Sequence, residues 1–108
     1  MILSDTAILS AMESGDIVVE PFDRDRLGTN SYDVCLGKNL ACYVDDVLDA
    51  RVHNQVERFE IAPEGIVLAP GKTYLGVTEE YTETRRYVPF LEGKSSVGRL
   101  GIDIHATA

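Results

Sequence analysis

The stretch "SYDVCLG" (residues 31–37) alternates polar and apolar side chains with the two-residue period of a β-strand. Its apolar members, Tyr32, Val34 and Leu36, would share one face, and Gly37 ends the run with a residue that is typical of turns. A strand over residues 31–36 is therefore predicted.

Similar short runs flank this stretch on both sides. We expect further strands at residues 17–20, 40–44, 65–68 and 73–78 and from residue 101 onward, with Gly and Pro residues between them. Ahead of the strands, Ser4 and Asp5 suit the N-cap of a short amphipathic helix that would end at Gly15. One helix followed by many short strands indicates a mainly β fold, an antiparallel sandwich or barrel.

The last predicted strand alternates Ile102, Ile104 and Ala106 with Asp103, His105 and Thr107. It reaches Ala108 without a turn, a cap or a charged tail, and an unfinished, half-apolar strand of this kind invites aggregation. Residues 1–108 are therefore expected to form a single domain that is truncated at its C-terminus.

The composition limits both the number of domains and the partners. With 108 residues, 44% of them hydrophobic, the chain has room for one domain with a modest core. Its formal net charge of -8 disfavours nucleic-acid polymers and anionic membrane surfaces. A small polyanion that arrives with a divalent cation stays compatible with a local cationic pocket, because salt screens distant charges over about 8–10 Å.

Cysteine usage and hydropathy indicate the compartment. Cys35 and Cys42 are too few for a disulfide scaffold and too far apart for a C-x-x-C motif, so free thiols in a reducing compartment are expected. The N-terminus lacks a basic region, and no apolar run approaches the ~18 residues of a membrane span. These features predict a cytoplasmic protein with no membrane partner.

The stretch "EGKSSVGRLG" (residues 92–101) contains Gly-Lys-Ser, the last letters of a phosphate-binding P-loop. A P-loop needs its first glycine five residues before the Gly-Lys pair, and that position is Val88, followed by Pro89. A bulky side chain and a proline there exclude a P-loop nucleotide site.

Two cations and two hydroxyls nevertheless lie within six residues, at Lys94, Ser95, Ser96 and Arg99. A helical turn over residues 95–100, capped by a serine and closed by Gly101, would leave backbone N–H groups free for an anion. It would also place Ser95 and Arg99 on one face, at positions i and i+4. On these residues alone, phosphate binding and a serine cap beside two solvated cations both remain open.

Four blocks of the sequence carry a family resemblance. In chain order they read "MILSDTAILSAMESGDIVVEPFD" (1–23), "LGTNSYDVCLG" (27–37), "LAPGKTYLGVTEEY" (68–81) and "LEGKSSVGRLGIDIHATA" (91–108). Together they resemble the deoxycytidine triphosphate (dCTP) deaminases, a branch of the trimeric deoxyuridine triphosphatase (dUTPase) superfamily. The resemblance implies a mainly β fold, an incomplete dUTPase-like β-clip or jelly-roll barrel with a short N-terminal α-helix.

The resemblance also implies a nucleotide site, formed by Lys94, Ser95, Ser96, Val97, Gly98 and Arg99. Lys94, Ser96 and backbone amides would hold the phosphates together with Mg²⁺, while Ser95 and Arg99 would act beside the pyrimidine. The carbonyl of Ala108 would lie near the reacting C4 amino group. Lys94 replaces an arginine that is common in the family, so a bidentate phosphate contact would become monodentate.

The implied reaction is the zinc-independent, hydrolytic deamination of dCTP to dUTP and ammonia, a step toward dUMP and dTMP. A homotrimer is implied as well, with dTTP as a candidate feedback ligand. The sequence lacks the H-x-E and P-C-x-x-C pattern of the zinc deaminases, so no metal bound directly by side chains is expected. The general-base glutamate of the family would follow the position of Ala108 and is missing from these residues.

The other titratable residues are interpreted without a catalytic role. Glu92, Asp103, His53 and His105 are assigned to ordinary surface, strand or loop positions. The pairs Glu79-Glu80 and Arg85-Arg86 are assigned to solvated turns or to subunit contacts.

Three alternatives stay open. A bifunctional enzyme would carry dCTP to dUMP and diphosphate, and the Gly-Lys-Ser-Ser wording of the motif mildly favours it. A dUTP diphosphatase fits less well, because that sister family usually has a proline-arginine-serine-glycine type of motif. The third alternative is a catalytically inactive, nucleotide-binding or subunit-capping fragment.

Overall fold

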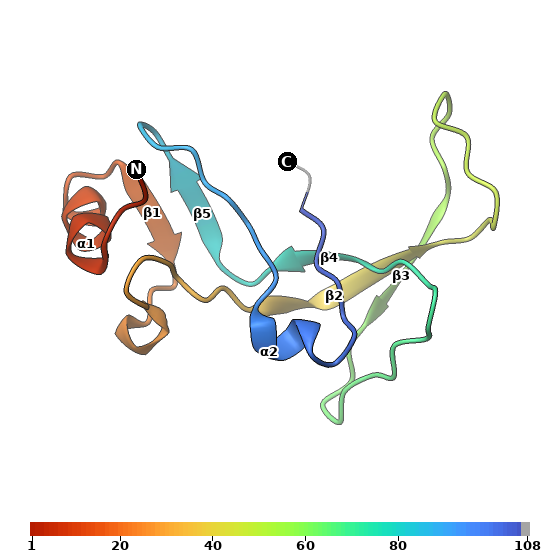
Figure 1. Cartoon of the computed structure of the whole chain (residues 1–108). Helices are drawn as coiled ribbons and strands as arrows, with labels where there is room; N and C mark the ends of the chain where they lie inside the picture. Colours follow the sequence, from red (N-terminus) through yellow and green to blue (C-terminus); the bar gives the residue numbers. More distant parts are fainter. Residues whose placement is uncertain (107–108) are drawn as a thin grey trace.

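The computed structural model describes residues 1–106 and contains two antiparallel sheets and a few short helices (Figure 1). In chain order the elements are α1 (Asp5–Glu13), β1 (Ile17–Glu20), the 3-10 helix η1 (Arg24–Arg26), β2 (Leu36–Tyr43), β3 (Val56–Glu60), β4 (Leu75–Thr78), β5 (Tyr81–Thr84) and α2 (Ser95–Gly98). The mainly β architecture with its short N-terminal helix confirms the predicted fold class and is consistent with an incomplete dUTPase-like fold. Within the described residues, every helix is too short or too polar to cross a membrane.

Helix α1 begins and ends where its capping residues predict. The Ser4 hydroxyl accepts a hydrogen bond from the Ala7 N–H at 3.3 Å, which satisfies one of the N–H groups left free at a helix start. Beyond the helix, Gly15 has a φ of +79°, a left-handed conformation that glycine adopts without strain. The helix buries Ala11 and packs beside β1.

Strands β1 and β5 form the first sheet, an antiparallel pair with Ile17 opposite Thr84 and Glu20 opposite Tyr81. β1 has the predicted bounds, and its Val19 is buried. β5 was not predicted, because "YTET" contains three polar residues and no apolar alternation. Its strand conformation depends on the hydrogen bonds that β1 supplies.

The second sheet has the order β3-β2-β4, with β2 in the centre. The central strand buries Leu40, Ala41 and Cys42 and thereby forms most of this sheet's core. Gly76 of β4 lies opposite Leu40, and an added Cβ there would lie 2.9 Å from Leu36 Cδ1 and 3.0 Å from Leu40 Cδ2. The absence of a side chain at Gly76 therefore lets β4 approach β2 closely.

The stretch at residues 31–36 departs from its prediction. Tyr32 forms an isolated antiparallel bridge with Leu27, and the regular strand β2 begins only at Leu36. The backbone groups of this stretch are bonded to a helical turn and to side chains: the Asp33 N–H, for example, donates to the Arg26 carbonyl of η1 at 2.9 Å. Burial alternates only from Ser31 to Val34: Leu36, predicted for the same apolar face as Tyr32, is 63% exposed. The hydrogen bonds of the stretch are not those of a sheet.

The remaining strand predictions met mixed outcomes. The strands predicted at residues 40–44 and 73–78 overlap β2 and β4. The stretches 65–68 and 101–106 contain no strand, because β-pairing needs a neighbouring strand and neither stretch has one within the described part of the chain. Strand β3, with the mostly charged sequence "VERFE", escaped prediction for the same reason as β5.

The hydrophobic core is small and open. Among residues 1–106 no side chain is fully buried, and the buried apolar set is Ala11, Val19, Leu27, Leu40, Ala41 and Cys42. The chain exposes 9014 Å², whereas a compact monomer of this mass would expose about 6000 Å². The radius of gyration is 16.4 Å, against about 13 Å for a compact domain of this length. The difference leaves about 3000 Å² of surface, as much as a large obligate interface buries.

Candidate functional site

Residues 94–101 form one short helical turn and its exit. The Lys94 carbonyl accepts hydrogen bonds from the Val97 and Gly98 N–H groups at 3.0 and 2.9 Å, which starts α2. Gly101 has a φ of +79° and closes the turn as predicted. The predicted serine cap is wrong: Lys94 is the N-cap residue, and its side chain makes no capping bond. Ser95 is the first residue of the helix. It therefore does not occupy the N-cap position, where an extended backbone lets a side chain accept a hydrogen bond from the first turn.

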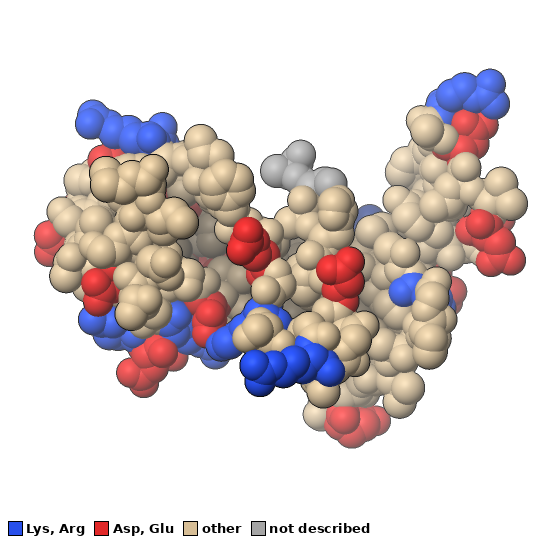
Figure 2. All heavy atoms as spheres, viewed as in Figure 1, with Lys and Arg blue, Asp and Glu red and all other residues tan. Residues whose placement is uncertain are grey.

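The predicted nucleotide-binding side chains lie together on the surface. Lys94 precedes α2, Arg99 follows it, and the helix itself contributes Ser95, Ser96, Val97 and Gly98. Val97 is half-buried and the other five residues are exposed. Figure 2 shows a patch of Lys and Arg side chains over α2. Ala108, the remaining predicted site residue, lies outside the described residues.

Ser95 and Arg99 are joined through the backbone. The Arg99 N–H donates to the Ser95 carbonyl at 3.0 Å, the i to i+4 relation on which their shared face depends. Both side chains reach solvent from the same turn of helix, so a hydroxyl and a guanidinium are available to one ligand.

Lys94 forms an ion pair with Asp33, a residue 61 positions earlier in the chain. Their side chains are 60% and 49% exposed, so the pair lies at the surface and remains open to a third charged group. The contact connects α2 to the stretch just before β2, and it gives the cationic group at Lys94 a defined position.

Asp33 lies beside the predicted site, and the sequence analysis did not identify it. It was assigned only to the polar side of a predicted strand. Two signals were available: Asp33 lies within one of the four resembling blocks, and its charge is opposite to that of Lys94. Neither signal specifies a contact across 61 residues, because the pairing arises from the tertiary fold.

Glu80 also differs from its predicted role. It was assigned to a solvated turn or subunit contact, but the residue is only 6% exposed. Its two carboxylate oxygens accept the Cys35 N–H at 2.8 and 3.1 Å. Its neighbour Glu79 is exposed, as expected for a turn residue. The two adjacent glutamates therefore have different structural roles.

Two open cavities lie beside the second sheet and at its junction with the first. The larger, of about 470 Å³, is lined by Leu36, Gly37, Lys38, Asn39, Ile61, Val77, Thr78 and Glu79. The smaller, of about 270 Å³, is lined by Pro21, Phe22, Asp23, Arg26, Tyr32, Cys35, Glu79 and Glu80. In the smaller cavity the Phe22 and Tyr32 rings stack with 5.4 Å between centroids. Neither cavity is lined by a residue of the 94–99 segment.

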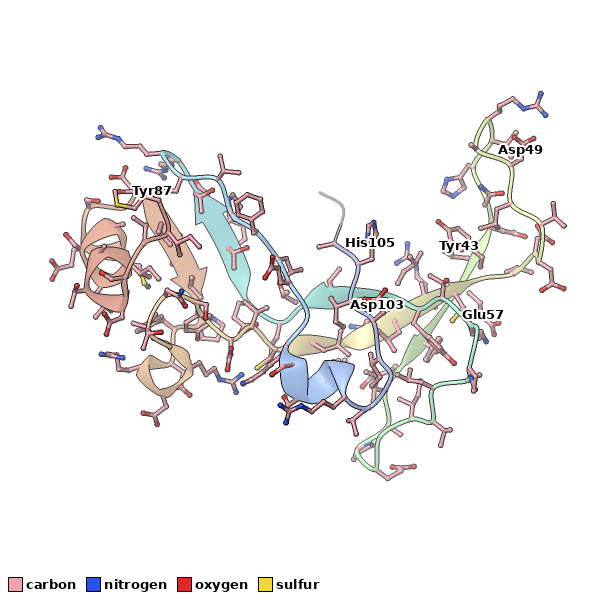
Figure 3. All side chains as sticks on the ribbon, viewed as in Figure 1. Tyr43, Asp49, Glu57, Tyr87, Asp103 and His105 are labelled. Atoms are coloured by element: carbon pink, nitrogen blue, oxygen red, sulfur yellow. The ribbon has the colours of Figure 1, made fainter. Side chains whose placement is uncertain are left out.

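The remaining carboxylates and histidines do not gather at α2. Asp103 and His105 are exposed on the irregular segment that follows α2, where Figure 3 labels both. Glu92 and His53 are exposed as well. Across residues 1–106, no three His, Cys, Asp or Glu side chains come together in a way that could hold a metal ion.

Shifted pKa values occur outside the site. A hydrogen bond from Arg51 lowers the pKa of Asp49, which Figure 3 shows near the tip of the long β2–β3 connection. On β5, a hydrogen bond from Arg85 lowers the pKa of Glu83, and Glu83 in turn raises the pKa of Tyr81. These groups form local surface pairs on exposed elements.

Comparison with known proteins identifies the family. The family described as dCTP deaminase-like matches residues 2–108. A protein of Clostridium botulinum (strain Alaska E43 / Type E3), named "dCTP deaminase, dUMP-forming", is 49% identical over 108 residues, all of this chain and 62% of the relative. Relatives of the same name in Clostridium acetobutylicum and Cytophaga hutchinsonii are 50% and 48% identical over the same shares.

The chain thus spans somewhat less than two thirds of the length of the relatives that it matches. The family match is continuous, because it also covers residues 38–64, where the four resembling blocks leave a gap. The chain belongs to the dCTP deaminase-like family.

Proposed function

We propose that the intact protein converts dCTP to dUMP, releasing ammonia and diphosphate. The observation that carries this proposal is the similarity, over all 108 residues, to relatives whose names specify dUMP as the product. It supports the bifunctional alternative better than the dUTP-forming reaction that was expected first.

The reaction requires two hydrolytic steps. In the first, a water oxygen bonds to C4 of cytosine, the C4–N bond breaks, and the amino group leaves as ammonia after gaining protons. In the second, a water oxygen bonds to the α-phosphorus, and the bond to the bridging oxygen breaks to release diphosphate. Each water must lose a proton to a general base, which the residues of α2 do not provide.

The residues around α2 are suited to binding rather than to proton transfer. Lys94 offers an ammonium group for phosphate, and Ser96 with neighbouring backbone amides offers hydrogen-bond donors. Ser95 and Arg99 share one face of the turn and would contact the pyrimidine side of the nucleotide. The Ala108 carbonyl would accept a hydrogen bond from the C4 amino group.

Mg²⁺ fits this site as a companion of the nucleotide. Magnesium is usually bound through one or two carboxylates, substrate phosphates and water, and Asp33 is the carboxylate beside Lys94. When bound, Mg²⁺ would neutralise part of the triphosphate charge. Asp33 and Lys94 would then offer an anion and a cation at the same edge of the triphosphate.

A cytoplasmic homotrimer is part of the proposal, because the family resemblance implied the trimer and the sequence composition implied the compartment. The exposed surface of 9014 Å² agrees with it only in a general way, since burying an excess of about 3000 Å² would need extensive contacts with other chain segments or subunits. Sedimentation of the intact protein should give three times the protomer mass, and a monomer would contradict this part of the proposal.

The product decides between the candidate reactions. The intact protein is incubated with dCTP and Mg²⁺, ammonia is measured, and the nucleotides are separated by anion-exchange chromatography. We expect dUMP and ammonia in equal amounts, without accumulation of dUTP. Accumulated dUTP would indicate a deaminase alone, and dUMP made from dUTP with dCTP left intact would indicate a diphosphatase. Binding of dCTP without any product would leave a nucleotide-binding module.

A further inference from the structure

Glu80 is the one charged side chain that is buried among residues 1–106, at 6% exposure. Burying a carboxylate costs free energy unless hydrogen bonds compensate for the lost water. Here the compensation comes from the Cys35 N–H, which lies 2.8 and 3.1 Å from the two carboxylate oxygens. A charge retained at such a position calls for a structural or functional explanation.

The turn around Glu80 bonds both backbone polar groups of one residue, Cys35. Its neighbour Glu79 donates its N–H to the Cys35 carbonyl at 2.8 Å, while the Glu80 carboxylate accepts the Cys35 N–H. The Thr78 hydroxyl donates to the Glu80 carbonyl at 2.8 Å and fixes the turn itself. The turn between β4 and β5 thus clamps Cys35, although residues 31–35 belong to no strand.

The clamped residue is close in sequence to the candidate site. Cys35 follows Asp33 by two residues, and Asp33 forms the ion pair with Lys94. The Asp33 N–H is fixed by the Arg26 carbonyl at 2.9 Å on the other side. Because Lys94 is 60% exposed, its position depends more on Asp33 than on packing.

We propose that Glu80 is a positioning residue for the nucleotide site. Through the Cys35 amide it fixes the stretch that carries Asp33, and through Asp33 it sets the position of Lys94. Glu80 itself does not touch the nucleotide. The proposal rests on the proposed function for its kinetic readout, but the anchoring of Cys35 can be measured without turnover.

The first test is the Glu80→Ala variant of the intact protein. It leaves the Cys35 N–H without its acceptor, so Asp33 and Lys94 lose their fixed geometry. We expect the KM for dCTP to rise about 10-fold while kcat changes less than about 3-fold, the pattern of lost binding rather than lost chemistry. A purely structural role would instead reduce the active fraction, lowering kcat at an unchanged KM.

Two conservative variants separate reach from charge. Glu80→Gln keeps an oxygen at the same distance but removes the charge, and it should restore a KM near that of the wild type. Glu80→Asp keeps the charge but is one methylene shorter, and it should behave like Glu80→Ala. If Glu80→Asp instead kept the wild-type KM and Glu80→Gln raised it, the proposal would be overturned, because charge rather than the bond to Cys35 would then matter. Glu79→Ala is the matched control. Glu79 is the exposed neighbour of Glu80, and this variant keeps the Glu79 N–H that bonds to the Cys35 carbonyl.

A double-mutant cycle tests the route through Asp33. If Glu80 acts through Asp33, Glu80→Ala should add little to the KM of an Asp33→Asn variant, since the coupled pair is non-additive. If the rise in KM of the double variant equalled the product of the rises in the two single variants, the route through Asp33 would be contradicted.

Amide hydrogen exchange at Cys35 keeps the inference separate from the proposed function. Exchange should accelerate at least about 10-fold in Glu80→Ala and stay unchanged in Glu79→Ala. If the wild type does not turn over dCTP, the proposed function fails, and the dissociation constant for dCTP replaces KM. Unchanged exchange at Cys35 in a folded Glu80→Ala protein would overturn the inference even if the enzyme is active.

Discussion

Replacing Lys94 by alanine separates the site's binding role from its contribution to folding. The ion pair with Asp33 has side chains that are 60% and 49% exposed, and a surface pair of this kind contributes at most about 1 kcal/mol. Lys94→Ala should therefore lower the free energy of unfolding by less than about 1 kcal/mol. The effect of this variant on the free energy of unfolding should therefore be small.

The effect on the nucleotide should be larger. A hydrogen bond to a charged group contributes about 1.5–3 kcal/mol, equivalent to roughly 10- to 150-fold in affinity. Lys94 gives up part of its interaction with Asp33 when a phosphate arrives, so we expect the lower end, about a 10-fold rise in the KM for dCTP. Lys94→Arg should keep the KM at or below the wild-type value, because a guanidinium binds phosphate and can do so with two hydrogen bonds.

Steady-state kinetics of the intact protein, together with urea unfolding, measure both quantities. Lys72→Ala is the matched control, since Lys72 is an exposed lysine whose ammonium lies 5.6 Å from the Tyr74 ring centroid, in a different loop. A Lys94→Ala protein with unchanged KM would refute the phosphate role. A loss of stability well above 1 kcal/mol would refute the surface character of the ion pair.

Two further predictions concern the sheets. Gly37→Ala should lower the free energy of unfolding, measured by urea titration, by about 1–3 kcal/mol. The new Cβ would lie 3.0 Å from the Val77 carbonyl oxygen. The control Gly28→Ala, whose nearest atoms would lie at 3.5 Å, should be nearly neutral in the same titration. The hydrogen bond from Arg85 holds the pKa of Glu83 below its ordinary value of 4.5, so its stabilising contribution is present above that pH and is lost as the pH falls through the lowered pKa. Glu83→Gln should therefore flatten the acid limb of stability below pH 4.5, and an unchanged limb would contradict this assignment.

Local chemistry was sufficient to predict the elements that depend on few neighbours. The Ser4 cap and Gly15 delimit α1, and Gly101 closes the turn after α2 with a positive φ. Each of these features involves a residue and its own chain neighbours, so the sequence contains the whole interaction. The mainly β class followed from the same local signals.

Features that depend on distant partners were not predictable in this way. Residues 31–35 alternate like a strand, but the side chain of Glu80 takes the Cys35 N–H that a strand would use for its ladder. Glu79 and Glu80 are adjacent and chemically identical, yet only the second is buried. For the site, the resemblance predicted the 94–99 segment, but no local pattern specified the contacts of Asp33 or Glu80.

The exposed position of residues 94–99 suits binding of the triphosphate better than the proposed chemistry at the cytosine ring. Deamination needs a base near the water and a pocket that excludes bulk solvent. The residues from Lys94 to Arg99 lie on an exposed turn, and the cavities of about 470 and 270 Å³ are lined by other segments. Exposed cations at fixed positions can bind a triphosphate in this setting, whereas the cytosine ring would still face water. The proposed chemistry at C4 therefore calls for a base that residues 94–99 do not supply, and the proposed clamp at Cys35 would hold Lys94 in position for the triphosphate.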